Sequence, residues 1–201
     1  MVNRIVKFFF AVIVLAFASG LVRSFLTTDS VEAQSPRVQN FKDNDELKRL
    51  CAEDQSDRTP PPGKSIDWAV VNPRDKGRLS RVKEISTHNL LQTANDYDCA
   101  AIVLQHGQVP EDILLAHEFW VVAISKGKND QETLSMAAAS EDRFLANIGR
   151  PQRFGTQLHS ANNGPVELYP IDSSVPDGLR RVMIGHSLAE VKARAAEMNR
   201  K

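Results

Sequence analysis

Charged and amide side chains interrupt the apolar faces of several predicted helices. Asp54 and Arg58 lie four residues apart and continue the stripe of Leu47 and Leu50, so they can pair on one helix face. A buried polar group without a partner costs about 1–3 kcal/mol. Such side chains must therefore bond one another, bind water or face a cleft. We predict a shared polar ligand-binding pocket, formed by Asp54, Arg58, Gln105, His106, Asp142, Arg143 and Gln157.

Two histidines and an aspartate are the candidates for catalysis. His106 ends an apolar run, His117 lies on an apolar helix face, and Asp142 lies within an Ala-rich helix. A histidine oriented by Asp54 or Asp142 can act as the general base of a hydrolase. The alternative is that both histidines bond backbone carbonyls in the core and that the aspartates form structural ion pairs.

The motifs of several enzyme and cofactor classes are missing from the sequence. The segment after His117 lacks the second histidine of a His-Glu-x-x-His zinc motif, and no cysteine pair has zinc spacing. Residues 62–65 (PGKS) match the end of a phosphate-binding loop, but Arg58 stands where its first glycine is needed. No Gly-x-Ser-x-Gly motif is present. We therefore predict no metal and no cofactor.

The composition restricts the class of protein. The 201 residues include 25 Lys and Arg against 25 Asp and Glu, so the chain has no net charge. This balance argues against nucleic acid as a partner, because nucleic-acid-binding domains carry a basic face. Two cysteines, Cys51 and Cys99, are too few for a disulfide scaffold. They form either one disulfide after export or two buried free thiols.

The N-terminal residues have the pattern of a targeting segment. Arg4 and Lys7 precede the unbroken apolar run 8–18 (FFFAVIVLAFA), which is shorter than the roughly 20 residues that span a bilayer. We predict that residues 1–33 are a signal peptide and that the protein is exported, to the periplasm or outside the cell. The alternative is an uncleaved membrane tether through residues 5–25, with an exported domain.

The rest of the chain predicts a linker over residues 34–43 and one domain over residues 44–201. The fold class is mostly α, an array of about six to seven helices with one small β-hairpin, and the third and fourth helices form its centre. The expected elements are helices from Asp43 or Asp45 to Arg58, after Asn72-Pro73, from Asp96 to Gly107, from Pro110 to Ile124, from Asp130 to Gly149, from Asp177 to Ile184 and after Ser187, with strands at 154–158 and 166–169.

A series of short elements along the chain also resembles a known family. Asp54-Gln55, Gln105-His106 and Asp142-Arg143 are followed by residues 149–157 (GRPQRFGTQ) and by Asp177 with Arg180. In this order they resemble a bacterial family of mostly helical proteins classed only as a domain of unknown function. The resemblance covers about Asp45 to Met198, with Phe154 where the family motif has a tyrosine. It implies the same grouping of residues and no particular activity.

The leading hypothesis is an exported binding or interaction module. Its partner is a small polar ligand or a component of the cell envelope, held in the predicted pocket. One alternative is a hydrolase that uses a His/Asp pair in the same pocket. The other is a purely structural polar network, without a pocket, that fixes how the helices pack.

Overall fold

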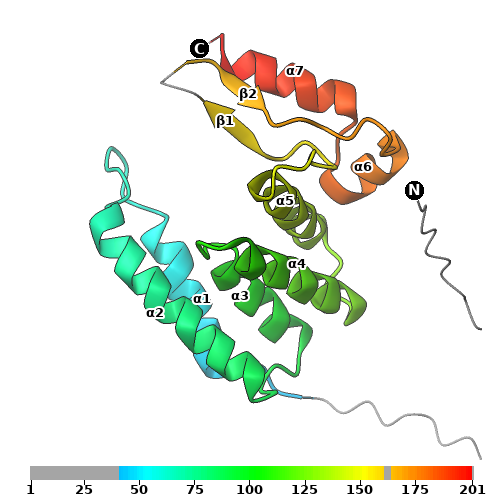
Figure 1. Ribbon diagram of the computed structural model, residues 1–201. Helices are drawn as coiled ribbons and strands as arrows, with labels where there is room; N and C mark the ends of the chain where they lie inside the picture. Colours follow the sequence, from blue (N-terminus) through cyan, green and yellow to red (C-terminus); the bar gives the residue numbers. More distant parts are fainter. Residues whose placement is uncertain (1–40, 161–163, 201) are drawn as a thin grey trace, which may run out of the picture. The chain divides into compact units, whose positions relative to one another are not determined.

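The computed structural model describes residues 41–160 and 164–200, and the mostly α class with one small hairpin is confirmed (Figure 1). The predicted signal peptide (residues 1–33) and residues 34–40 of the predicted linker lie outside the described residues. No helix in the described part is long and apolar enough to cross a bilayer. The elements are α1 (Asp45–Asp57), α2 (Trp68–Thr87), α3 (Ala94–Leu104), α4 (Pro110–Ser125), α5 (Gln131–Asn147), β1 (Leu158–Ser160), β2 (Val166–Leu168), α6 (Asp177–Ile184) and α7 (Leu188–Met198).

Side-chain caps fix where the helices begin. The Asn44 side chain accepts from two backbone N–H groups at the start of α1, where Asp43 or Asp45 was expected as the cap. Thr93 caps α3, and Asp96, expected to open that helix, is its third residue and completes a capping box. Ser187 and Glu190 form the expected capping box of α7.

Helix α2 begins earlier than the sequence predicts. Asn72-Pro73 indicates a cap followed by a helix start, but α2 already begins at Trp68 and is capped by the Asp67 side chain. Pro73 lies inside the helix, where it removes one backbone hydrogen bond. The preceding turn stays helical because it brings Val71, which is 3% exposed, into the core.

The core is built largely from α1 to α4. Helix α3 contacts α1, α2 and α4, and α4 contacts α5. Trp120 of α4 is fully buried, and its indole N–H donates to Asp98 of α3 at 3.0 Å. These contacts place α3 between three other helices.

The hairpin is shorter than predicted. Strands β1 and β2 pair antiparallel with Leu158 opposite Leu168, but residues 154–157 form no strand. Their backbone N–H groups bond side chains instead of a neighbouring strand, as described below. Helix α7 packs against β2, and the Asn199 side chain bonds the backbone of Val166 at the strand's start.

Candidate functional site

A buried carboxylate in α1 binds groups from its own helix and from the end of α3. Asp54 is fully buried, and its Oδ1 lies 3.0 Å from Nη1 of Arg58 and 3.0 Å from Nδ1 of His106. Oδ2 accepts from the side-chain amide of Gln55 at 3.0 Å. The predicted contact between Asp54 and Arg58 is therefore present, and His106 joins them although it lies 52 residues further along the chain.

The contacts continue from Arg58 into α2. Nη2 of Arg58 donates to Asp75 at 2.6 Å, and Asp75 also accepts from Nη2 of Arg78 at 2.5 Å. Nη1 of Arg78 donates to Asp57 at 2.8 Å, and Arg74 donates to the other oxygen of Asp57 at 2.7 Å. We call this set the α1–α2 ion-pair network; its members are Asp54, Asp57, Arg58, Arg74, Asp75 and Arg78.

Opposite charges in this network outweigh the effect of burial on three of its groups. Burial alone would raise the pKa of Asp75, but hydrogen bonds from Arg58 and Arg78 hold that pKa below its ordinary value. Hydrogen bonds from Arg78 and Arg74 likewise outweigh burial at Asp57 and lower its pKa. Burial would lower the pKa of Arg78, but Asp75 and Asp57 raise it. These three groups are therefore charged at neutral pH.

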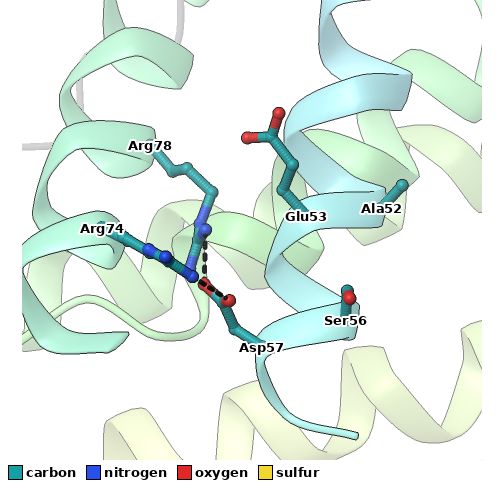
Figure 2. A pocket seen from close by; sticks show the side chains of 6 residues that line it. All are labelled: Ala52, Glu53, Ser56, Asp57, Arg74 and Arg78. Carbon is teal, nitrogen blue, oxygen red and sulfur yellow. Dashed lines mark hydrogen bonds and ion pairs between the residues drawn. The ribbon is translucent and has the colours of Figure 1, made fainter. Parts of the chain in front are cut away.

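One edge of the network lines a groove of about 650 Å³ between α1 and α2. Figure 2 shows Arg74 and Arg78 reaching from α2 to Asp57 at the end of α1. Arg78 is only 5% exposed, and its buried Nε has no hydrogen-bond partner among the residues described. The groove is lined by Ala52, Glu53, Ser56, Asp57, Arg74 and Arg78.

Asp142 of α5 binds backbone and not another charged group. Its carboxylate is fully buried and accepts from the backbone N–H groups of Arg153, Phe154, Gly155 and Thr156 at 2.6–3.2 Å. The Thr156 hydroxyl adds a further bond at 2.9 Å. Asp142 therefore holds the loop that replaces the predicted strand, which is a structural role.

Arg143, next to Asp142, connects α5 with the end of α3. Its Nη1 donates to the backbone carbonyl of Gln105 at 2.9 Å, and its Nε approaches the Gln157 side chain at 3.4 Å. Gln157 also donates to the carbonyl of Ala139 at 3.1 Å. Burial lowers the pKa of Arg143. The network of Asp54 and the cluster around Asp142 thus meet at the adjacent residues Gln105 and His106.

The seven predicted pocket residues are therefore connected, but as two groups that mostly bond each other or backbone. His117 is in neither group: its Nδ1 lies 2.9 Å from the carbonyl of Ala137, as expected of a core histidine. The predicted set did not include four residues of the ion-pair network. These four are Asp57, Arg74, Asp75 and Arg78. Helical spacings of three and four relate them to one another and to Asp54 on α1 and α2, but such spacings are also typical of a solvated helix face.

The described residues form neither a disulfide nor a metal-binding cluster. Cys51 and Cys99 are free thiols, with Cys51 buried. The interaction between the two thiols, together with burial, raises the pKa of Cys51, and the same interaction lowers that of Cys99. Within residues 41–160 and 164–200, no three His, Cys, Asp or Glu side chains are grouped closely enough to hold a metal ion.

Comparison with known proteins identifies no relative. No family model, no curated protein and no solved structure matches this chain. The resemblance to a helical bacterial family stays a prediction.

Proposed function

We propose that this chain is an exported binding module that holds a small polar molecule in the groove between α1 and α2. The observation that carries the proposal is that the ion-pair network opens along one edge into the groove. Arg78 forms part of the wall with its guanidinium nearly buried, while Arg74 is more than half exposed beside it. Charged groups of the network are therefore within reach of a ligand along an open groove.

The lining of the groove favours a particular ligand chemistry. Glu53 and Asp57 line the groove with carboxylates, Arg74 and Arg78 with guanidinium groups, and Ser56 with a hydroxyl. Because Asp57, Arg74 and Arg78 already bond one another, a ligand would use the donors and acceptors that these bonds leave over, above all on the exposed Arg74. A simple anion would meet the two carboxylates, and a simple cation would meet the two arginines. The balanced charge supports a zwitterion such as a free amino acid, or a neutral polyhydroxylated molecule such as a sugar of the cell envelope.

Calorimetric titration of the purified full chain with free amino acids and with mono- and disaccharides tests this proposal. We expect one class to bind and Arg74→Gln to weaken its binding at least about tenfold, the loss of one hydrogen bond to a charged group. The matched control is Lys76→Gln, because Lys76 is exposed on the same helix and does not line the groove. If neither class binds, or if both variants bind like the wild type, the proposed site is wrong.

The export part of the proposal rests on the N-terminal sequence. Arg4 and Lys7 followed by an apolar run have the order of a signal peptide. Intact-mass measurement of protein from a bacterial host, with separate periplasmic, membrane and cytoplasmic fractions, tests it. We expect a shortened chain outside the cytoplasm. A full-length chain in the membrane fraction would favour the tether through residues 5–25, and a full-length chain in the cytoplasm would contradict export.

A second candidate function, a hydrolase, is favoured by one contact. His106 places Nδ1 against Asp54, which leaves Nε2 as the nitrogen that can take a proton from a water molecule. Turnover of a panel of ester and amide substrates, measured across pH, tests this function. We expect His106→Gln to abolish any turnover that depends on a histidine base. Turnover equal to that of the wild type would exclude His106 as the base.

A further inference from the structure

A second groove, of about 420 Å³, lies among α5, the hairpin and the C-terminal helices. One wall is a stripe of α7 at helical spacing, formed by Val191, Ala195 and Met198. Met198 is 55% exposed. The remaining apolar lining consists of Met136, Ala139, Gly155, Leu158, Leu168 and Ile184.

Two of the four polar side chains that line this groove already have partners within the chain. The Ser135 hydroxyl donates to the carbonyl of Met183 at 3.1 Å. The Thr156 hydroxyl donates to Asp142 at 2.9 Å and accepts from Gln157. Because these groups are satisfied, the body of the groove offers a ligand mainly apolar contact.

Arg194, one of the other two polar side chains, provides a positive charge at the same groove, and His186 is the second. A guanidinium nitrogen of Arg194 contacts Nε2 of His186, and Arg194 is exposed. Among the residues that the structure describes, no carboxylate forms an ion pair with Arg194. The acid one turn earlier, Glu190, is already bonded by Ser187 and Arg181. Arg194 is thus a cation beside an apolar groove, with no acidic partner in residues 41–160 and 164–200.

From this combination we infer that the groove binds an amphipathic carboxylate, a single acyl chain with an anionic head. The chain packs against the α7 stripe, and the head accepts hydrogen bonds from Arg194, with His186 beside it. Arginine suits this head because its planar guanidinium matches the two oxygens of a carboxylate. The site does not depend on the groove between α1 and α2, which is lined by different residues.

Titration of the detergent-free full chain with octanoate, decanoate and dodecanoate tests the inference by calorimetry. We expect affinity to rise about fourfold for each added methylene that the groove buries. Decanol, which has the tail without the charge, should bind at least about tenfold more weakly than decanoate. No binding of any carboxylate at millimolar concentration, or equal affinity for decanol and decanoate, would overturn the inference.

Variants of α7 separate the two parts of the proposed contact. Arg194→Gln should weaken decanoate binding about tenfold or more, while Lys192→Gln, an exposed change on the same helix outside the groove, should not. Met198→Glu should weaken binding by charge repulsion. Met198→Gln, which keeps the size without the charge, should weaken it less. Equal binding by Arg194→Gln and wild type would overturn the role of the head group. A dimer in native mass spectrometry that Met198→Glu dissociates would instead make this face an interface between copies of the chain.

Discussion

Replacing Asp142 with asparagine is the sharpest test of whether the polar residues of α5 serve structure or ligand binding. Oδ1 of Asp142 accepts from the N–H of Arg153 at 2.6 Å, and Oδ2 accepts from Gly155 and Thr156, each at 2.9 Å. An asparagine keeps one oxygen and places an NH2 group where the other oxygen was. The NH2 group then faces backbone N–H donors in a site from which water is excluded.

The size of the effect follows from the number of donors that lose their acceptor. If the amide oxygen replaces Oδ2, Arg153 loses its acceptor; if it replaces Oδ1, both Gly155 and Thr156 do. The bonds that survive also lose the strengthening that the negative charge gives them. We expect Asp142→Asn to lower the free energy of unfolding by about 3 kcal/mol, since each unsatisfied buried donor costs about 1–3 kcal/mol. For a chain of this length that is a decrease of roughly 6–12 °C in Tm.

Urea unfolding followed by circular dichroism, together with thermal melting, measures both quantities. The matched control is Glu141→Gln, because the neighbouring Glu141 makes only a surface ion pair with Arg153. It should cost less than about 1 kcal/mol. An Asp142→Asn protein within 1 kcal/mol of the wild type would refute the structural role, and would favour Asp142 as a ligand-binding residue if binding were lost at the same time.

Three further predictions concern pH, backbone conformation and the thiols. Because the pKa of Asp75 is lower in the folded chain, the stabilisation by this carboxylate is present above its ordinary pKa of 3.8 and is lost as the pH falls through the folded pKa. In urea unfolding at a series of pH values, Asp75→Asn should therefore lose less stability at acid pH than the wild type does, and an equal loss would contradict this. Gly155→Ala should lower the free energy of unfolding by at least about 1–2 kcal/mol, because φ is +91° and the added Cβ would lie 2.7 Å from Val191; a melt matching the wild type would be inconsistent with this backbone. Iodoacetamide mapped by mass spectrometry should label Cys99, whose pKa is lowered, before Cys51, whose pKa is raised, and the reverse order would contradict these opposite shifts.

Local signals in the sequence were sufficient for most helices. Pro110 at the start of α4, Asp130 before α5 and the Ser187 capping box each predict a helix start that the structure confirms. Pro73 misled the prediction because Val71, two residues earlier, packs into the core and offsets the cost of a proline inside the helix. Alternation over residues 154–158 also misled it, since these backbone groups bond Asp142 and Gln152 instead of a strand.

The sequence by itself determined that polar residues stand on apolar helix faces and must find partners. It also supplied the pairing of Asp54 with Arg58, because residues four apart on a helix are neighbours. Only the tertiary structure decided that His106 joins Asp54, that Asp142 binds a loop, and that Arg78 lines a groove. Those contacts join segments far apart in the chain, and no local spacing specifies them; they depend on how the helices pack.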